Sequence, residues 1–307
     1  MSWLLSGEQA NQPARLRALL GSRRTLLVPG AHNSLAGLLA KQAGFEALYL
    51  SGAALSASYG LPDVGLLTLD ELARAARAIV RATALPLIAD GDTGYGETLN
   101  VVRLVRELEE AGAAAVQIED QEMPKRCGHL EGKRLVPAEV MLVRLRAALY
   151  ARRDLLVIAR TDALAVAGLD EAIARARAYV AAGADVIFPE GVRSEAEYAA
   201  FRKTLDVPLL ANMTEFGKTP YLTAAQFQSL GYNLVIYPVS SLRLAAKAMA
   251  IGYATLREAG TLEGLLPQML TRQELYQVIE YSEHEELERR LQPGAPGAGG
   301  PGDGQPG

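Results

Sequence analysis

Eight short apolar runs, each followed by a stretch with helical spacing, constrain the fold of this chain more than any other feature. The runs are continuous rather than alternating, which is typical of parallel strands that are buried on both faces. Eight repeats of this strand–helix unit predict an α/β fold, a (β/α)8 TIM-type barrel. The predicted strands are Thr25–Ala31, Ala47–Gly52, Leu85–Asp92, Ala114–Asp120, Asp154–Arg160, Asp185–Glu190, Val207–Met213 and Leu234–Val239.

Two of the expected helices carry a start signal. Thr68 and Glu71 have the spacing of a capping box, in which each side chain caps the other's backbone. Ser194 and Glu197 have the same spacing and predict a second box.

The chain continues beyond the eighth strand. Extra C-terminal helices are expected over Leu242–Glu258 and Arg272–Leu291, so residues 1–292 are interpreted as one barrel domain. The last segment, Pro293–Gly307, is rich in Pro and Gly. It cannot bury enough apolar surface to offset its ordering entropy, and we expect it to be disordered.

Composition narrows the class of protein. Of the 307 residues, 50% are hydrophobic and 21% are charged, which allows a large core. The net charge of -4 argues against a nucleic-acid partner, which would favour a basic surface. One cysteine fits a reducing compartment, and neither a signal peptide nor a run of ~18 apolar residues is expected. We therefore expect a cytoplasmic protein without a membrane partner.

Polar side chains follow the predicted strands, at the end where barrels of this type carry their chemistry. Acids follow the third, fourth and sixth strands, and an arginine ends the fifth. The residues concerned are His32, Asn33, Ser51, Gly52, Asp90, Asp92, Glu119, Asp120, Arg160, Asp162, Glu190, Asn212, Thr214, Ser240 and Arg243.

Asp90 and Asp92, in "DGDTGYG", are the sharpest local feature. On an extended backbone residues two apart point to one side, so two carboxylates would meet and repel unless a cation lies between them. Oxygen ligands suit Mg²⁺ or Mn²⁺, and Glu119 on the next strand is a candidate third ligand or holder of a metal-bound water. The alternative is an Asp-Gly turn with capping side chains and no metal.

Cys127, in "PKRCGH", has two interpretations. A lone cysteine is commonly a small buried apolar residue. Here the neighbours include Lys125, Arg126 and His129, and cationic neighbours lower a thiol's pKa, which favours a functional thiol. A cysteine–histidine hydrolase is a competing interpretation, but a nearby acid pair with a metal favours polarisation of an oxyacid.

Several motifs resemble the isocitrate lyase / phosphoenolpyruvate mutase superfamily, and within it the branch of the 2-methylisocitrate lyases. They are "LSGAALSASYGLPDVG", "DGDTGYG", "PKRCGH", "IARTDALAVAGLDEAIARA", "FPEG", "LLANMTEFGKTP" and "TRQELY", and the resemblance runs from about Arg15 to Leu291. Of these, "KRCGH" is the motif most specific for the lyase branch. The resemblance implies an Mg²⁺-dependent carbon–carbon lyase, with Mn²⁺ as the alternative metal.

The implied reaction is retro-aldol cleavage of a tricarboxylate, 2-methylisocitrate, to pyruvate and succinate, in propionate catabolism through the methylcitrate cycle. The resemblance also implies a homotetramer in which a C-terminal helix is swapped between subunits. A loop over Lys125–Arg134 is expected to close over the substrate.

Residue roles follow from the same resemblance. Cys127 is expected to act as the general acid, with Tyr49 and Glu190 as candidates for the general base. Asp90 and Asp92 match the metal site, and Glu119 supports it. The implied substrate-binding residues are Ser51, Gly52, Ala53, Cys127, Gly128, Arg160, Glu190, Asn212, Met213, Thr214, Arg243 and Arg272.

Three alternatives remain open from the sequence. The chain could be an isocitrate lyase, or a lyase or decarboxylase for another oxo or hydroxy acid, which would share the metal site without needing Cys127. It could also be a barrel that binds small carboxylates without turnover. Intact Asp90, Asp92, Cys127 and Arg160 argue against this last class.

Overall fold

The computed structural model describes residues 3–6, 11–22, 24–126, 128, 132–217 and 219–292, and within these ranges all eight predicted strands are confirmed. Each strand is shorter than its apolar run because the ends of the run enter turns. The strands are β1 (Leu26–Pro29), β2 (Leu48–Leu50), β3 (Leu87–Asp90), β4 (Ala115–Glu119), β5 (Leu156–Thr161), β6 (Val186–Pro189), β7 (Leu210–Asn212) and β8 (Leu234–Tyr237).

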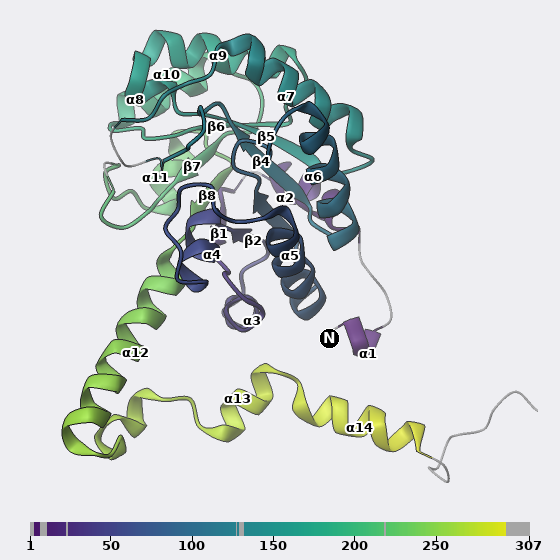
Figure 1. Ribbon diagram of the computed structural model, residues 1–307, viewed down its shortest axis with the longest axis vertical. Coiled ribbons are helices and arrows are strands. Elements are labelled where there is room, and N and C mark those ends of the chain that lie inside the picture. Colours follow the sequence, from purple (N-terminus) through teal and green to yellow (C-terminus); the bar gives the residue numbers. More distant parts are fainter. Residues whose placement is uncertain are drawn as a thin grey trace, which may run out of the picture.

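The strands are parallel and close into a barrel (Figure 1). Regular ladders join β2 through β6 into one sheet and β7, β8 and β1 into another. Two isolated parallel bridges link the sheets, Gly30 with Tyr49 and Ile187 with Leu209. The predicted TIM-type α/β barrel is therefore observed.

Alternate residues of each apolar run belong to two different layers of the core. In β5, Leu156 and Ile158 belong to one buried cluster, whereas Val157 and Ala159 belong to another. The first cluster contains inward-facing strand residues, and the second contains the buried faces of the surrounding helices. Because both faces of each strand are buried, the sequence lacks alternation.

Helices surround the barrel, and one of them covers the end at which the strands begin. Leu16 and Leu20 of the second helix join the inner cluster and so close the N-terminal end of the barrel. The helices up to β8 are α1 (Trp3–Ser6), α2 (Gln12–Leu20), α3 (Ser34–Gln42), α4 (Gly52–Ser58), α5 (Leu69–Thr83), α6 (Thr98–Ala111), α7 (Ala138–Ala151), α8 (Ala163–Ala167), α9 (Leu169–Ala181), α10 (Glu195–Thr204) and α11 (Ala224–Ser229).

The capping boxes had different outcomes. Thr68 and Glu71 form the reciprocal box at the start of α5, as predicted. At α10 the prediction was wrong in one half: Ser194 accepts from the Glu197 backbone, but the Glu197 carboxylate accepts from the backbone N–H of Arg193 instead. Glu197 therefore caps the backbone N–H of Arg193 and not that of Ser194, which the prediction required.

The C-terminal part forms an arm that leaves the barrel along its first helix and then returns, so that Val278 is buried where the arm contacts α3 (Figure 1). It consists of α12 (Ser240–Ala259), the 3-10 helix η1 (Glu263–Gln268), α13 (Arg272–Val278) and α14 (Tyr281–Leu291). The helix predicted over Leu242–Glu258 is confirmed, but the single helix expected over Arg272–Leu291 is interrupted, because Glu280 adopts the left-handed conformation with φ of 53°.

The arm exposes many apolar side chains. None of the residues of α12 is buried, and Leu244 and Tyr253 are 74% and 71% exposed. Within the described ranges, no helix has both the length and the apolar character that crossing a membrane requires. The expected disorder of Pro293–Gly307 lies outside the described residues, and the assignment of residues 1–292 to one domain stays a prediction.

Helix α6 offers a matched test of the outer core. Leu104 is fully buried, and Leu99 on the same helix is 80% exposed. Leu104→Ala is expected to lower the free energy of unfolding by about 2–5 kcal/mol, because it removes buried contacts and leaves a cavity. Chemical denaturation measures this, and Leu99→Ala is expected to change stability by less than ~0.5 kcal/mol. Equal losses in the two variants would show that α6 does not pack as described.

Candidate active site

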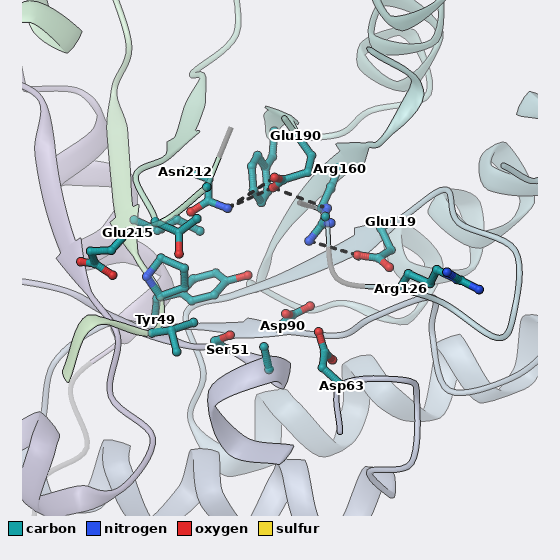
Figure 2. Close-up of a pocket in the computed structure, with 18 of the residues that line it drawn as sticks. Tyr49, Ser51, Asp63, Asp90, Glu119, Arg126, Arg160, Glu190, Asn212 and Glu215 are labelled. Atoms are coloured by element: carbon teal, nitrogen blue, oxygen red, sulfur yellow. Dashed lines mark hydrogen bonds and ion pairs between the residues drawn. The ribbon is translucent and has the colours of Figure 1, made fainter. Parts of the chain in front are cut away.

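The inward-facing positions of three neighbouring strands continue from apolar to charged residues. Asp90 follows Ile88 by two residues, Glu119 follows Gln117, and Arg160 follows Ile158. Since side chains two apart in a strand share a face, these charges enter the space directly above the inner core. A cavity of about 170 Å³ lies there, at the C-terminal ends of the strands (Figure 2).

Most of the predicted site residues meet at this cavity. Those that line it are Tyr49, Ser51, Ala53, Asp90, Glu119, Gly128, Arg160, Glu190, Asn212, Thr214 and Arg243. Gly52 lies just behind them and donates its backbone N–H to Asp90 Oδ2 at 3.1 Å.

Other predicted residues are not brought to the cavity. Met213 is 4% exposed and packs into the outer core, because it follows the inward-facing Asn212 by one position. Arg272 is exposed at the start of α13, on the arm. Cys127 lies outside the described residues, as do His129 and part of the loop expected to close over the substrate.

The two aspartates come together, but not in the way that an extended backbone predicts. β3 ends at Asp90, and Asp92 has a left-handed φ of 47°. The Asp92 backbone N–H donates to Asp90 Oδ1 at 3.2 Å, so Asp90 does cap a turn. A Cβ added at Gly52 would meet Asp92 Oδ1 at 3.2 Å and Asp90 Oδ2 at 3.3 Å, so both carboxylates crowd the same point beside Gly52.

Lys125 is the cation nearest to this pair. Its side chain is 4% exposed, and Nζ lies 2.6 Å from Asp92 Oδ1 and forms a second ion pair with Asp63. Burial opposes the charge on Lys125, but the surrounding carboxylates, Asp92 first, raise its pKa. Burial and the neighbouring Asp90 raise the pKa of Asp92 to about 7 even in the presence of Lys125. One lysine therefore does not balance the acids.

Counting charges strengthens this point. The described residues that line the cavity include five carboxylates, Asp63, Asp90, Glu119, Glu190 and Glu215, and four cations, Lys125, Arg126, Arg160 and Arg243, and Asp92 beside Lys125 adds a sixth carboxylate. A site with excess negative charge would repel a carboxylate ligand. A divalent cation at the acids would correct the balance.

The donor set fits such a cation. Glu119 Oε1 is buried without a hydrogen-bond partner, whereas Oε2 lies 3.2 Å from Arg160 Nη1. Burial raises the pKa of Glu119 well above its usual value. Within the described ranges, no three His, Cys, Asp or Glu side chains are arranged to hold a metal by themselves. Mg²⁺ takes one or two carboxylates and completes its shell with water and substrate, so Asp90 and Asp92 would be the residues that hold it.

Arg160 organises the opposite wall. Figure 2 shows Glu119, Arg160, Glu190 and Asn212 in a row that faces Asp90 and Asp63. The Arg160 guanidinium lies 4.0 Å from Glu190 Oε2, and Asn212 Nδ2 donates to the same oxygen at 3.1 Å. Burial disfavours the charge, but its carboxylate partners raise the pKa of Arg160, which stays a fixed cation.

Gly128, directly after Cys127, touches this wall. A Cβ added at Gly128 would lie 2.6 Å from Arg160 Nη2 and 2.6 Å from Glu190 Cδ and Cγ. Only glycine fits without moving these buried side chains.

Gly128→Ala is therefore expected to lower the turnover number by about 10- to 100-fold, because it displaces Arg160 and Glu190. Steady-state kinetics on the substrate proposed below measures the effect, with circular dichroism as the check on folding. Gly21→Ala is the matched control, since a Cβ there meets only ordinary contacts at 3.6 Å. Turnover of Gly128→Ala within twofold of the wild type would contradict the packing described.

Tyr49 lies at the floor of the cavity. It is 2% exposed, and its hydroxyl donates to Gln117 Oε1. Burial, followed by the charge of Asp90, raises the pKa of Tyr49 well above its usual value. A phenol of this kind stays protonated at neutral pH, and its one proton is donated to Gln117, so a ligand would meet the phenol oxygen as an acceptor.

A second wall of the cavity is apolar. It is formed by Phe188, Ile236 and Pro238, and the Phe188 ring centroid lies 5.3 Å from the guanidinium carbon of Arg160. Arg243 Nη1 donates to Thr214 Oγ1 at 3.1 Å and pairs with Glu215 Oε2 at 2.9 Å. The cavity thus joins three arginines, Arg126, Arg160 and Arg243, with a buried acid cluster and apolar side chains.

Comparison with known proteins gives this arrangement a family. The family model described as phosphoenolpyruvate phosphomutase matches residues 16–257. The chain belongs to the phosphoenolpyruvate phosphomutase family. A 2-methylisocitrate lyase of Bacillus subtilis (strain 168) is 50% identical over 293 residues, which cover 95% of this chain and 97% of that protein. The resemblance predicted from the motifs is confirmed.

Solved structures agree. The crystal structure of 2,3-dimethylmalate lyase, described as a member of the PEP mutase/isocitrate lyase superfamily, is 38% identical with a TM-score of 0.85, covering 91% of this chain and 95% of that one. The structure of phosphonopyruvate hydrolase in complex with oxalate and Mg²⁺ is 35% identical with a TM-score of 0.83, covering 92% and 99%. The barrel is therefore that of the phosphoenolpyruvate phosphomutase family.

In this member of the phosphoenolpyruvate phosphomutase family, the motifs missed some of the cavity residues. Asp63 stands in the quoted stretch "GLPDVG" without a role of its own, and Lys125 in "PKRCGH" was considered only as a cationic neighbour of Cys127. Phe188, Ile236 and Pro238 read as ordinary strand residues. Only the closed barrel shows that they face the cavity.

Proposed function

We propose that this protein is a carbon–carbon lyase that cleaves 2-methylisocitrate to pyruvate and succinate. The observation that carries the proposal is the combination, in one cavity, of fixed arginines, a buried acid cluster and an apolar wall. The named activity of the Bacillus subtilis relative, at 50% identity over nearly the whole chain, supports the same substrate.

The side chains suit a tricarboxylate with a methyl group. Guanidinium groups bind carboxylates strongly, which assigns Arg243 and the donors of Arg160 that Asp162 does not use to two of the three. Ser51 and Ala53 line the opposite side of the cavity. The apolar wall of Phe188, Ile236 and Pro238 would receive the methyl group, which isocitrate lacks.

Asp90 and Asp92 would hold Mg²⁺, with Mn²⁺ as the alternative, and Glu119 would accept from a bound water. The excess of buried carboxylates supports this assignment, as does the Mg²⁺ in the related phosphonopyruvate hydrolase structure. When bound, the metal would lower the pKa of the substrate hydroxyl and neutralise the adjacent carboxylate.

The chain's own groups would move two protons. Glu190, which is fully buried beside Arg160 and Asn212, would accept the proton of the tertiary hydroxyl. The bond between the hydroxyl-bearing carbon and its neighbour then breaks, giving pyruvate and the carbanion of succinate. Cys127 would donate its thiol proton to that carbon as general acid. Tyr49, whose proton is donated to Gln117, would orient the substrate by accepting a hydrogen bond.

Product analysis tests the proposal. The purified protein with Mg²⁺ is incubated separately with 2-methylisocitrate, isocitrate and 2,3-dimethylmalate, and the products are identified by mass spectrometry. Pyruvate with succinate, from the first substrate at the highest kcat/KM, is expected. Glyoxylate from isocitrate, or propionate from 2,3-dimethylmalate, at a higher kcat/KM would replace the proposed substrate, and carbon dioxide as the product would indicate a decarboxylase.

We further propose a cytoplasmic homotetramer in which the arm is swapped between subunits. The exposed apolar residues of α12 support this, and so does the position of Arg272 away from its own cavity. In a swapped assembly Arg272 would bind substrate in a neighbouring subunit. The expected mass by light scattering is four times the 32.8 kDa of one chain.

Mixing inactive subunits tests the swap. Arg272→Ala and Cys127→Ser subunits, unfolded and refolded together, should regain part of the wild-type activity, because some sites then receive both functional residues. No recovery from the mixture, with successful refolding of the wild type as control, would contradict a shared site.

A further inference from the structure

Lys133 is a buried lysine that the proposed reaction does not use. Its side chain is 2% exposed, yet it does not line the cavity. Nζ donates to the carbonyl oxygen of Gly128 at 2.6 Å and to Asp162 Oδ1 at 2.7 Å. A buried ammonium with two strong acceptors is held in one place.

Asp162 connects this lysine to the active-site arginine. Arg160 Nε donates to Asp162 Oδ2 at 3.0 Å, and Arg160 Nη2 donates to Asp162 Oδ1 at 3.1 Å. Asp162 Oδ1 therefore accepts from Lys133 and Arg160 at once. Despite full burial, the two cations lower the pKa of Asp162 to about 2, so the carboxylate stays ionised.

The backbone of Asp162 is anchored from behind. Its N–H donates to Asp120 Oδ1 at 2.9 Å, and Asp120 Oδ2 accepts from Tyr179 and Thr161 at 2.8 and 2.7 Å. Asp120 is itself fully buried. Asp162 is thus held rigidly and can anchor Lys133 by an ion pair.

We propose that Lys133 is a positioning residue that seats Gly128 against Arg160. It fixes the Gly128 carbonyl and the Arg160 guanidinium to the same carboxylate, at the place where the absence of a Cβ on Gly128 permits close approach. Lys133 acts through these two residues and touches neither substrate nor metal.

The kinetic test rests on the proposed lyase function, and a binding test does not. Lys133→Met keeps the length of the side chain and removes its charge and donors. The turnover number on 2-methylisocitrate is expected to fall about 10- to 100-fold, because Gly128 and Arg160 are no longer held together. The dissociation constant of oxalate in the presence of Mg²⁺, measured by calorimetry, is expected to rise at least about tenfold, since Arg160 is less well oriented.

Arg134→Met is the matched control. Arg134 is the next residue, but it is exposed and pairs with Glu122 on the surface. Its turnover and oxalate affinity are expected to stay within twofold of the wild type. Lys133→Arg keeps the charge and is expected to recover at least a third of the lost turnover. Lys133→Gln, which keeps a neutral donor group, carries the test with an expected tenfold loss if the Met variant does not fold.

The outcomes separate the two proposals. Normal turnover and normal oxalate affinity in folded Lys133→Met would overturn the positioning role, and so would an equal loss in Arg134→Met. If the wild type binds oxalate but does not cleave 2-methylisocitrate, the proposed function fails. The oxalate affinities of the Lys133 and Arg134 variants then still decide the role of Lys133.

Discussion

Cys127→Ser is expected to lower the rate of 2-methylisocitrate cleavage by at least about a hundredfold. A general acid contributes ~100–10,000-fold, and a serine hydroxyl is a far weaker acid than a thiol. Stopped assays of pyruvate formation measure the loss. Because Cys127 is the chain's single cysteine, the variant also removes every thiol, and alkylation of the wild type should inactivate it in parallel.

The variant should keep its other properties. Mg²⁺ and succinate binding, measured by calorimetry, are expected to stay within threefold of the wild type, since the acid cluster and the arginines are unchanged. Turnover of Cys127→Ser within tenfold of the wild type would remove Cys127 from its role. That outcome would favour the lyase or decarboxylase that shares the metal site without needing a thiol.

Asp90→Asn is expected to slow cleavage by at least about a thousandfold. A bound metal supplies several kcal/mol of charge stabilisation, and each ~1.4 kcal/mol is a factor of ten in rate. The change conserves shape but removes one charge from the pair that crowds Gly52. Titration with Mn²⁺, followed by electron paramagnetic resonance, should show weaker metal binding before any substrate is added.

Asp206→Asn is the control for this change, because Asp206 is exposed before β7 and far from the cavity. It is expected to bind Mn²⁺ and turn over substrate like the wild type. If Asp90→Asn bound Mn²⁺ with normal affinity, the acid pair would be a capped turn and the metal would lie elsewhere. The hydrogen bond from Asp92 N–H to Asp90 already shows that the turn exists, so the experiment decides whether it also holds a metal.

The fold was predictable because its signal is local. A strand buried on both faces leaves a continuous apolar run, and eight such runs can be counted without knowing their partners. Residues at the strand ends, such as Asp90, Glu119 and Arg160, were predictable for the same reason, since the barrel brings all strand ends to one side.

The errors arose where the backbone leaves regular structure. Asp92 was placed by assuming an extended chain, but the strand ends two residues earlier. Met213 lies one position past the end of β7 with its side chain in the outer core, and its assignment to the substrate stays a prediction. The helix breaks at Glu280 because this residue adopts the left-handed conformation. Since it is not a glycine, the sequence does not indicate the break.

Long-range pairs in loops were beyond prediction. The position of Lys133 in the sequence, near Cys127, does not indicate which side chains its ammonium group contacts. Its partner Asp162 lies 29 residues further along the chain. The location of Arg272 on the arm, away from the cavity, likewise depends on how distant segments pack, which no motif indicates. Such residues become visible only when distances between distant segments are known.

The two isolated bridges that close the barrel bear on how a ligand changes the molecule. Ladders of regular hydrogen bonds hold β2 through β6 together, and the junctions to β1 and β7 have far fewer. Asp90, Glu119 and Arg160 stand on one side of these junctions, and Asn212 and Arg243 on the other. A tricarboxylate bound by residues of both sets would connect the two sheets. Substrate would therefore stabilise the part of the barrel wall that has the fewest hydrogen bonds between strands. Amide protons near Tyr49 and Leu209 should therefore exchange more slowly once the site is filled.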